Sequence, residues 1–397
     1  MPLPPADAVI CGAGIAGITA AFHLVRRGMT NLVLVDDREP LTLTSDKGTQ
    51  AYRNFWPGPD DTPDDAMLRF MDRSIDLLED RAAECDNAFQ LNRRGYVFLT
   101  ANPAEAARLR IDPDPAAIRR LFPFISETAI AMLRVPRAGW LDAVRLGRWL
   151  LDRTLAAGAR LVRDRVTGVS IVGGRVQAVR LRSGGEIPTG AFVLAAGPYL
   201  KEAAALLGLD LRVFCELHGK LTFRDDLRVI PQDVPLMIWN DPVGNLPPGL
   251  HFRPRGDPAN PLLLIIWTYD VRTQEPVWPP SFDPSYGEVL VRGMAAMVPG
   301  FARYQDRAAE GLVDGGYYCK TRENRPLIGP LPVAGAFVIG ALSGFGVMAS
   351  QAAGELLALH VAGDTLPGYA PAFLPSRYQD SAYLKRLPAL EQASGQL

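Results

Sequence analysis

At 397 residues the chain is long enough for two domains, and its 48% hydrophobic and 21% charged residues are typical of a folded globular protein. Its formal net charge of −1 at pH 7 gives no reason to expect a nucleic-acid partner or an anionic membrane surface. No run reaches the roughly 18 to 20 consecutive apolar residues of a membrane-spanning helix, and no secretory signal pattern opens the chain. We therefore expect a cytoplasmic protein.

The first predicted unit is a strand, a glycine turn, a helix and a second strand between residues 7 and 37. The first strand ends at Ile10, helical spacing runs from Ala16 to Arg27, and a second buried strand spans Leu32 to Val35. Between the first strand and the helix, the glycines of a G-x-G-x-x-G pattern stand at Gly12, Gly14 and Gly17.

Each glycine of this turn has a physical role. The first permits the tight turn, the second lets the backbone approach a pyrophosphate, and the third lets the helix pack closely on the strand. Asp36 follows the second strand at the distance where a carboxylate accepts hydrogen bonds from ribose hydroxyls. We predict a dinucleotide site at the helix N-terminus that also includes Ile15, Ala16 and Asp37. The alternative is a glycine-rich turn in an unrelated α/β fold.

Two kinds of strand follow in the middle of the chain. Strands separated by Gly-Gly turns lead to an apolar strand from Ala191 to Ala195, and a longer segment alternates apolar and polar residues. Alternation places His218 with Lys220 on one face of its strand, and His251 with Arg253 on one face of another. If that face meets the ligand, these residues line a cavity; if it meets water, they are ordinary surface residues.

The last unit, "GAFVIGALSGFGVMASQAAGELLALHVAGD", repeats the order of strand, glycine loop and helix. Parallel α/β signatures therefore occur at the beginning, middle and end, with β-rich segments between them. We predict an α/β protein with a discontinuous nucleotide-binding domain and a second, antiparallel-sheet domain for the substrate. The first domain is predicted to comprise residues 1–85, 140–205 and 319–397, and the second 86–139 and 206–318. The widely spread histidines and cysteines predict no metal site.

Four segments together resemble the D-amino-acid oxidase family of FAD-dependent oxidoreductases, the group that includes sarcosine oxidase and glycine oxidase. They are "VICGAGIAGITAA" with Asp36, "FVLAAGPYL", "GGYYCKTRENRPLIG" and "VIGALSGFGVMASQAAGELLA". The resemblance implies FAD as the dinucleotide, with the adenine against the backbone of Val166 and the turn at Ala196 and Gly197 beside the cofactor. It also implies that the last glycine loop approaches the flavin ring, through Gly344, Phe345, Gly346, Val347 and Met348.

The segment after the second strand, "TSDKGTQAYRNFW", matches the family segment that runs across one face of the flavin. The resemblance implies cofactor contacts for Ser45, Lys47 and Thr49, although Lys47 is alternatively a solvated loop residue. Arg53 falls on the arginine that in sarcosine oxidases helps bind the substrate carboxylate, a task for which a planar guanidinium is well suited.

Three features depart from the family pattern, one of which is the segment "KTRENRP": it places Thr321, Arg322 and Glu323 where the family has T-P-D, so its turn is not made rigid by proline. Met348 stands where sarcosine oxidases place a second carboxylate ligand, a lysine. Leu264 stands where those oxidases carry the lysine that promotes reaction with oxygen, so we expect Lys320 or Lys220 to supply the cation, or another electron acceptor to replace oxygen. Cys319 lies near the position through which some relatives bond the flavin, but that position falls on Gly316, so we expect non-covalent FAD.

We therefore expect an FAD-dependent enzyme that oxidises the C–N bond of an amine or amino acid by hydride transfer. The candidate catalytic residues are Arg53, Lys320, Lys220, His218 and His251. Because the cofactor performs the difficult step, no paired carboxylates or nucleophile motif are needed. The alternatives are an NAD(P)H-dependent flavin monooxygenase and a flavin-binding subunit or assembly factor without turnover. The expected partners are the small-molecule substrate, oxygen or another acceptor, and possibly a partner subunit.

Overall fold

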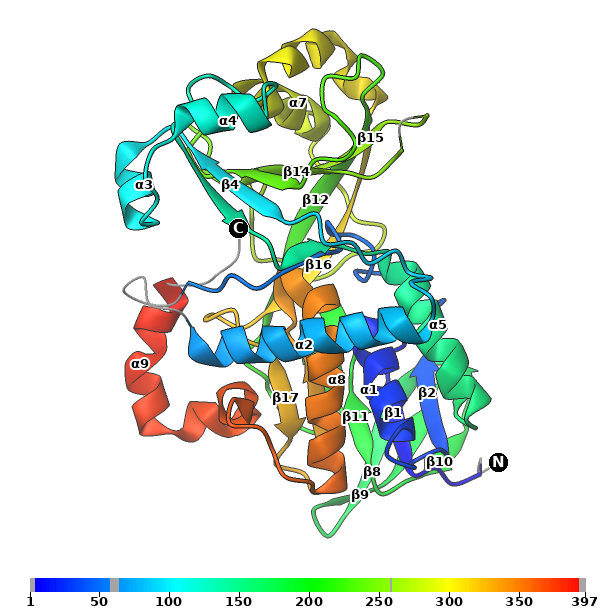
Figure 1. The fold of residues 1–397 in the computed structure, drawn as a ribbon. Coiled ribbons are helices and arrows are strands. Elements are labelled where there is room, and N and C mark those ends of the chain that lie inside the picture. The colour runs from blue at the N-terminus through cyan, green and yellow to red at the C-terminus, as the bar shows by residue number, and fades with distance from the viewer. Residues whose placement is uncertain (1–3, 58–63, 258, 393–397) are drawn as a thin grey trace.

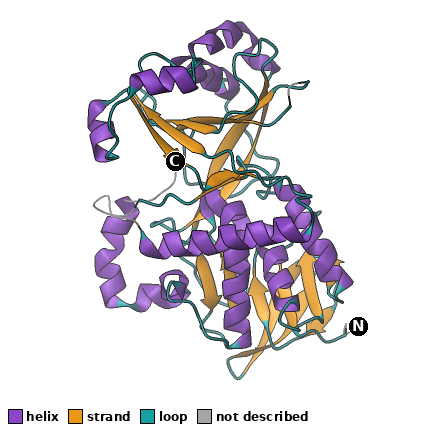
Figure 2. Cartoon of the chain, viewed as in Figure 1, coloured by secondary structure: helices purple, strands orange, loops and turns teal. Residues whose placement is uncertain are grey.

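The computed structural model describes residues 4–57, 64–257 and 259–392 (Figure 1). The chain forms two lobes, each built on its own large sheet, and helices lie on the outer side of both lobes (Figure 2). The chain passes between the lobes several times, so both lobes are assembled from segments far apart in the sequence. The predicted α/β class with an additional, largely antiparallel sheet is confirmed.

The first lobe contains a six-stranded sheet in the order β17-β18-β11-β1-β2-β7. All neighbouring pairs in this sheet are parallel except β17 with β18. The strands are β1 (Ala8–Cys11), β2 (Leu32–Asp36), β7 (Arg160–Arg163), β11 (Phe192–Leu194), β17 (Leu327–Pro330) and β18 (Ala336–Gly340). The central strands are apolar at successive positions because the sheet is covered on both faces.

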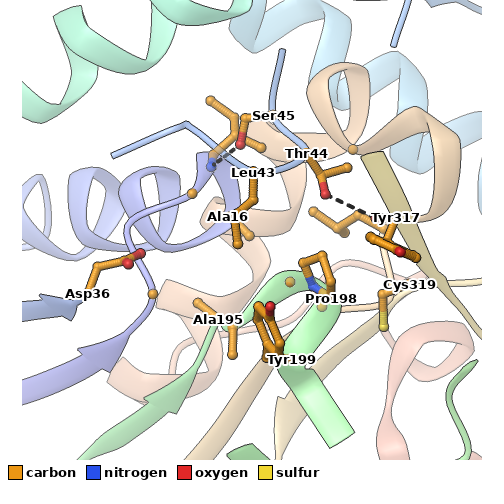
Figure 3. Close-up of a pocket in the computed structure, with 18 of the residues that line it drawn as sticks. Ala16, Asp36, Leu43, Thr44, Ser45, Ala195, Pro198, Tyr199, Tyr317 and Cys319 are labelled. Atoms are coloured by element: carbon orange, nitrogen blue, oxygen red, sulfur yellow. Dashed lines mark hydrogen bonds between the residues drawn. The ribbon is translucent and has the colours of Figure 1, made fainter. Parts of the chain in front are cut away.

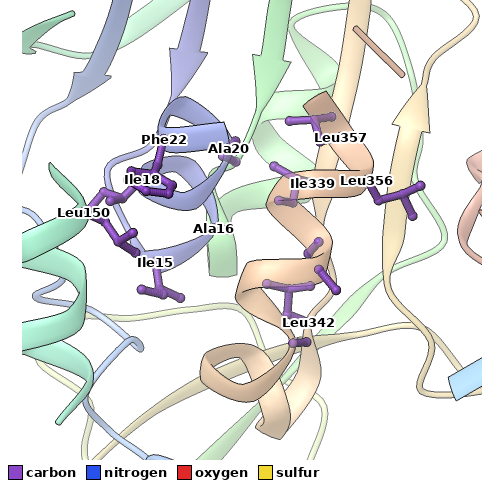
Figure 4. Packing of buried hydrophobic residues seen from close by; sticks show 14 of the residues in the cluster. Ile15, Ala16, Ile18, Ala20, Phe22, Leu150, Ile339, Leu342, Leu356 and Leu357 are labelled. Atoms are coloured by element: carbon purple, nitrogen blue, oxygen red, sulfur yellow. The ribbon is translucent and has the colours of Figure 1, made fainter. Parts of the chain in front are cut away.

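Helices cover one face of this sheet. They are α1 (Ile15–Val25), α2 (Asp65–Glu84), α5 (Ala143–Ala156) and α8 (Gly346–Ala362). Helix α1 packs against α5 and α8, and α2 lies across α8. Figure 4 shows Ile18 and Phe22 of α1 near Leu150 of α5, with Leu356 and Leu357 on the neighbouring helix α8. This packing gives the first lobe its main apolar core.

A three-stranded antiparallel sheet covers the opposite face, in the order β10-β9-β8. It comprises β8 (Val166–Val172), β9 (Arg175–Leu181) and β10 (Glu186–Pro188). Its inward side chains pack with those of β1, β2 and β11, together with α6 (Leu200–Ala205). The first lobe therefore has three layers: helices, parallel sheet and antiparallel sheet.

The second lobe is built on a seven-stranded sheet in the order β16-β12-β15-β14-β13-β4-β5. Its strands are β4 (Tyr96–Thr100), β5 (Ala131–Val135), β12 (Phe214–Arg224), β13 (Leu236–Trp239), β14 (Leu250–Pro254), β15 (Leu262–Ile266) and β16 (Leu312–Lys320). Every neighbouring pair is antiparallel except β13 with β4, which is parallel. Strand β4 comes from a separate, earlier segment, so local alternation in the sequence does not indicate its direction in the sheet.

The two faces of the seven-stranded sheet differ in chemistry. One face is apolar and packs under α4 (Pro115–Leu121), α7 (Tyr286–Met297) and the 3-10 segment η3 (Pro299–Glu310). The other face carries His218, Lys220, His251 and Arg253, all of which are buried. The polar face therefore does not meet water, and the alternative that these are ordinary surface residues is excluded.

The remaining elements connect or flank the two lobes. They are β3 (Ala51–Arg53), β6 (Ala138–Trp140), α3 (Pro103–Arg108), η2 (Gly197–Tyr199), η4 (Ser343–Phe345), η5 (Ala370–Phe373), η6 (Pro375–Gln379) and α9 (Ser381–Gln392). The predicted domain ranges stay a prediction; their boundary at residue 319 falls within β16.

One helical stretch of the described residues, Ser343–Ala362, is long and apolar enough by composition to cross a membrane. It consists of η4 and α8, and 61% of its most apolar window is buried within the protein. Because α1 and α2 pack against this helix, its apolar character is accounted for by its place in the core.

Candidate functional site

The larger cavity of the described chain, about 460 Å³, lies at the carboxyl ends of the parallel strands. Its walls include the segments that follow β1, β2, β11 and β18, four strands of the same sheet. Open α/β sheets bind their ligands at this edge, where connections leave the strands in different directions. Figure 3 shows Asp36, Ser45, Ala195, Tyr199 and Cys319 around the cavity.

The glycine turn between β1 and α1 has the geometry that the sequence predicts. Gly12 has φ of +117°, and a Cβ there would lie 2.4 Å from the carbonyl oxygen of Ala195. A Cβ on Gly17 would lie 1.9 Å from the carbonyl oxygen of Gly12. At Gly14 the nearest atom to a Cβ would be the Ser45 hydroxyl oxygen, 3.5 Å away. Gly12 and Gly17 are thus required by packing, whereas Gly14 faces open space that a ligand can fill.

The N-terminus of α1 points its backbone N–H groups toward this cavity. The N–H of Ile15 donates to the Ser45 hydroxyl oxygen at 3.0 Å, which ties the loop after β2 to the helix start (Figure 3). Asp36 accepts from the N–H of Ala13 at 2.7 Å through one oxygen and from the N–H of Arg38 at 2.9 Å through the other. Each carboxylate oxygen keeps a second lone pair that can accept from a ribose hydroxyl.

The second glycine loop, between β18 and α8, closes the other end of the cavity. Ala341 and Ser343 adopt positive φ values of 51° and 52°, conformations that cost free energy in residues with a Cβ. Such strain is concentrated at ligand sites, where the surrounding structure holds it in place. Helix α8 begins directly after this loop, so its N-terminal N–H groups and positive dipole end lie at the cavity wall.

Most of the residues predicted for the cofactor line this cavity. They are Gly12, Gly14, Ile15, Ala16, Asp36, Asp37, Ser45, Val166, Ala196, Gly197, Gly344, Phe345, Gly346 and Val347. Gly17 does not line the cavity, but its close contact with Gly12 holds the glycine turn in place. Thr49 and Met348 line a second, smaller cavity instead.

Lys47 is placed differently from the prediction. Its Nζ donates to Asp314 Oδ2 at 2.9 Å and lies 3.3 Å from Asp46 Oδ1. Lys47 is not among the residues that line either cavity of the described chain. Burial by itself would lower the pKa of Lys47, but the bond to Asp314 and the charge of Asp46 raise it above its usual range. The structure therefore gives Lys47 the role of a tie between its loop and β16.

The smaller cavity, about 60 Å³, adjoins the larger one. Tyr318, Gly344 and Phe345 line both cavities. The other residues around the smaller cavity are Thr49, Arg53, Tyr96, His218, Leu236, Ile238, His251, Ile266, Thr268 and Met348. Most of these residues come from the polar side of the seven-stranded sheet and from the loop and strand that follow β2, while Met348 lies on α8 and Thr268 follows β15. The cavity thus joins one cationic group, two imidazoles and a mainly apolar wall.

Arg53 supplies that cationic group. Its side chain is buried, its Nε donates to the carbonyl oxygen of Phe55 at 3.3 Å, and its guanidinium lies 4.9 Å from the ring centre of Trp56. Burial lowers the pKa of Arg53, and nearby Tyr96 opposes that change. A guanidinium stays protonated under these conditions, so the cavity holds a fixed positive charge.

The two histidines are fixed in different ways. His218 Nε2 lies 3.1 Å from Glu216 Oε2, whereas His251 Nδ1 lies 2.8 Å from the carbonyl oxygen of Gly249. Burial lowers the pKa of His218 and lowers that of His251 to about 4. Both imidazoles are consequently neutral near pH 7, and each can offer a lone pair.

The two lysines predicted as catalytic do not line either cavity of the described chain. Lys220 Nζ donates to the carbonyl oxygen of Asp46 at 2.6 Å, and burial lowers its pKa to about 8. Lys320 Nζ donates to Glu216 Oε2 at 2.9 Å. The backbone oxygen of Asp46 therefore holds the ammonium group of Lys220, and the carboxylate of Glu216 holds that of Lys320. Arg253 is similarly engaged and donates to the carbonyl oxygen of Thr49 at 2.5 Å.

Two further residues bear on the flavin chemistry. Cys319 lines the larger cavity opposite Cys215 in the β12–β16 pair, and their mutual hydrogen bond and burial raise the pKa of its thiol well above the usual value. A thiol held protonated is a poor nucleophile, which favours non-covalent cofactor binding. Leu264 is fully buried on β15 and lines neither cavity of the described chain.

Sequence reasoning missed several cavity residues. Tyr318 stands within a family segment and lies on the same face of β16 as the predicted residue Lys320. Tyr96 and Thr268 come from segments without a motif. Strand alternation relative to His218 and His251 is the signal that identifies such positions once the strand pairing is known.

The larger cavity fits the FAD that the fold implies. Gly14 leaves room for a pyrophosphate beside the N-terminus of α1, Asp36 suits a ribose, and the α8 N-terminus stands at the opposite end. A dinucleotide-binding cradle with a small adjoining cavity defines the class as a flavin-dependent oxidoreductase.

The sequence profile of the FAD dependent oxidoreductase family matches residues 7–359. The chain belongs to this family, and its predicted membership and FAD cofactor are confirmed. Among solved structures, L-proline dehydrogenase from P. horikoshii superposes with a TM-score of 0.80 at 20% identity, covering 96% of this chain and 99% of that one. Glycine oxidase from Geobacillus kaustophilus gives a TM-score of 0.76 at 17% identity, covering 94% and 98%. These likenesses describe the fold.

Among curated relatives, human mitochondrial dimethylglycine dehydrogenase is 24% identical over 228 residues. The match covers 52% of this chain but only 25% of the relative. The matched part of this chain thus corresponds to a quarter of that protein's length, so the match does not transfer the activity of the whole relative to this chain.

Proposed function

We propose that this enzyme oxidises the carbon–nitrogen bond of a small amine or amino acid. The observation that carries the proposal is the position of the smaller cavity, which shares Tyr318, Gly344 and Phe345 with the cradle for the flavin. A substrate in the smaller cavity would lie against the same loop as the cofactor ring. Position and exclusion of water are what a protein contributes to flavin chemistry.

The lining of the smaller cavity suits an amino acid. Arg53 brings a fixed positive charge that attracts a carboxylate, and the neutral imidazoles of His218 and His251 offer lone pairs to the N–H groups of an amine. Leu236, Ile238 and Ile266 supply apolar walls that favour a small aliphatic group. The names of the similar proteins, which refer to dimethylglycine, L-proline and glycine, support the same substrate class.

The proposed reaction removes a hydride from the carbon next to nitrogen. Bound FAD would accept that hydride with its electron pair, while the nitrogen lone pair forms the C=N bond of the imine. Water then hydrolyses the imine in solution. The side chains bind and orient the substrate, and the buried cavity keeps competing water away.

Anaerobic mixing tests this proposal. The FAD-loaded enzyme is mixed separately with N-methylglycine, N,N-dimethylglycine, L-proline, glycine and D-alanine, and flavin absorbance near the visible maximum is followed. Bleaching by at least one amine without any nicotinamide is the expected result. Bleaching by NADPH alone would favour a monooxygenase instead, and an enzyme that no amine bleaches would contradict the proposal.

Admitting air to the reduced enzyme then tests the electron acceptor. We propose that oxygen or another acceptor completes the cycle, and that slow reoxidation in air follows from Leu264, which brings no cation to its strand. Acid precipitation tests non-covalent binding, since it releases free FAD. The cytoplasmic location and a partner subunit stay predictions.

A further inference from the structure

Three polar side chains form a chain of contacts at the smaller cavity. His218 Nε2 lies 3.1 Å from Glu216 Oε2, and His218 Nδ1 lies 3.3 Å from the Thr268 hydroxyl oxygen. His218 and Thr268 line the cavity, whereas Glu216 lies behind the imidazole. The Tyr318 ring stacks on the imidazole with 4.1 Å between ring centres, which fixes the plane of the ring.

The position of Glu216 determines the tautomer of His218. Lys320 Nζ also donates to Glu216 Oε2, at 2.9 Å. Burial opposes ionisation of Glu216, but the hydrogen bonds from His218 and Lys320 hold its pKa below the usual value. An ionised carboxylate only accepts hydrogen bonds, so His218 Nε2 must carry the hydrogen. The lone pair of the imidazole is therefore on Nδ1, where it accepts from the Thr268 hydroxyl until a substrate N–H group replaces that donor.

Amine oxidation needs a neutral nitrogen, because a protonated amine has no lone pair to form the C=N bond. An amino group in water has a pKa of about 10, but removal from water together with a nearby cation lowers the pKa of such a group to about 5–7. Arg53 lines the same cavity and supplies the cation. A buried ammonium beside Arg53 thus becomes acidic enough for an imidazole to accept its proton.

We propose that His218 Nδ1 accepts the proton of the substrate ammonium, with Glu216 and Lys320 as positioning residues behind it. The inference rests on the proposed amine oxidation. The substrate N–H bond breaks, an Nδ1–H bond forms, and the electron pair stays on the substrate nitrogen. The imidazolium then lies against the Glu216 carboxylate, and the substrate is the zwitterionic form of an amino acid.

The charged groups around His218 fit this assignment. Glu216 stabilises the protonated ring, while Lys320 on β16 and His251 on β14 oppose it; Tyr318 packs on the ring face. His251 is the less suitable acceptor, because its Nδ1–H is bonded to the neutral carbonyl oxygen of Gly249, whereas the Glu216 carboxylate stabilises an imidazolium at His218. The Glu216 contact distinguishes the two imidazoles.

The pH dependence of flavin reduction tests the proposal. In His218→Asn the rate constant of reduction divided by the substrate Kd, measured anaerobically with the best amine of the panel, should fall about 100-fold at pH 7. The defect should shrink about tenfold for each pH unit above 7, because the variant depends on the free amine already present in solution. Loss of the stacking contact alone would lower the rate by the same factor at every pH, and that result would overturn the proposal.

Two variants complete the series. Glu216→Gln keeps an acceptor for Nε2–H but removes the charge, and it should lower the same quantity about tenfold at pH 7, again with recovery at high pH. His360→Asn makes the identical change in the last turn of α8, away from both cavities, and should match the wild type. A Glu216→Gln enzyme that behaves as the wild type at every pH would remove Glu216 from the assignment.

Nuclear magnetic resonance of the holoenzyme labelled with ¹⁵N-histidine provides a readout without turnover. The four histidines give a simple spectrum, and His218→Asn identifies one signal set. A neutral Nε2–H tautomer at pH 7 is expected; an Nδ1–H tautomer or an imidazolium would overturn the proposal. If no amine reduces the wild-type flavin, the proposed function fails and this inference with it. If amines reduce the wild type and His218→Asn follows it at every pH, only this inference fails.

Discussion

The two adjoining cavities recognise their ligands by different means. The larger cavity is built around two glycine loops and two helix N-termini, with Asp36 as the acid at the end of β2. The smaller cavity presents side chains, and the residues around it come from β3, β4, β12, β13, β14, β15, β16 and α8 as well as from the connecting segments. Backbone recognition depends on short motifs, whereas side-chain recognition depends on how distant strands pair. The cofactor site is therefore the easier one to predict.

Gly17→Ala should have the largest effect, because it attacks the backbone architecture of the larger cavity. The new Cβ would lie 1.9 Å from the carbonyl oxygen of Gly12. Overpacking of this kind costs about 1–3 kcal/mol or more. We expect the variant to be purified without FAD. Its thermal unfolding temperature should also be lower than that of the wild-type apoprotein.

Gly14→Ala is the matched control for that change. Its Cβ would have 3.5 Å to the nearest atom, so the apoprotein should unfold as the wild type does, while FAD binds at least tenfold more weakly because the methyl group occupies the pyrophosphate side. A Gly17→Ala protein that retains full yellow colour and normal unfolding would show that the turn is not set by this contact.

Arg53→Met should have the next largest effect and should touch only the smaller cavity. Loss of a charged hydrogen bond costs about 1.5–3 kcal/mol, so KM for amino acids should rise at least tenfold while the FAD content stays unchanged. An amine without a carboxylate, such as N-methylbenzylamine, provides the control, since its KM should change less than threefold. Equal increases for both substrates would argue against carboxylate binding by Arg53.

Met348→Ala should alter substrate preference at the boundary between the cavities. Met348 lines the smaller cavity, whereas its neighbour Val347 lines the larger one. Shortening the side chain should raise kcat/KM for N-benzylglycine relative to N-methylglycine by about tenfold, the effect of one or two methylene groups in an apolar pocket. Val347→Ala should leave this ratio unchanged; a similar shift in both variants would assign it to a general loosening of the loop.

Lys47→Met should have the smallest effect on catalysis. Because Lys47 is bound to Asp314 and Asp46 outside both cavities, KM and FAD affinity should change less than threefold. The free energy of unfolding at pH 7 should fall by on the order of 1 kcal/mol, since Asp314 is about a third exposed and water screens the pair. The control is Lys201→Met on the exposed surface, which should leave the free energy of unfolding unchanged.

The pH dependence of that loss follows from two opposite pKa shifts. Although burial acts against both charges, hydrogen bonding raises the pKa of Lys47 and lowers that of Asp314. The pair therefore stabilises the fold between about pH 4 and pH 10, the ordinary pKa values of the two groups. The difference between variant and wild type should vanish as the pH falls through the lowered pKa of Asp314, measured by urea unfolding. A difference that persists there would point to lost packing.

The sequence predicts the larger cavity well because its determinants are local. The spacing of Gly12, Gly14 and Gly17 and the acid at Asp36 define one βαβ unit, and the loop before α8 repeats the same order of elements. Within each of the two units, the strand, the glycine loop and the helix follow one another directly in the sequence. No long-range pairing has to be known to see that they can hold a dinucleotide.

The smaller cavity is predicted only in part. Alternation shows that His218 and Lys220 share a face of β12, but not which face meets the other lobe, nor that only His218 reaches the cavity. The partner of Lys47, Asp314, is 267 residues away in sequence, and that ion pair decides where the ammonium points. Tyr96 enters the site through strand pairing and Thr268 through the segment after β15, and no short motif predicts either placement.

The wall formed by Tyr318, Gly344 and Phe345 has a practical consequence. A molecule in the smaller cavity would contact three residues that also line the cavity for the cofactor. The absorbance of bound flavin should therefore change when a molecule binds in the smaller cavity, even if that molecule cannot be oxidised. A spectrophotometric titration with inert carboxylates such as acetate or benzoate can rank the affinities of the smaller cavity for different ligands before a substrate is known.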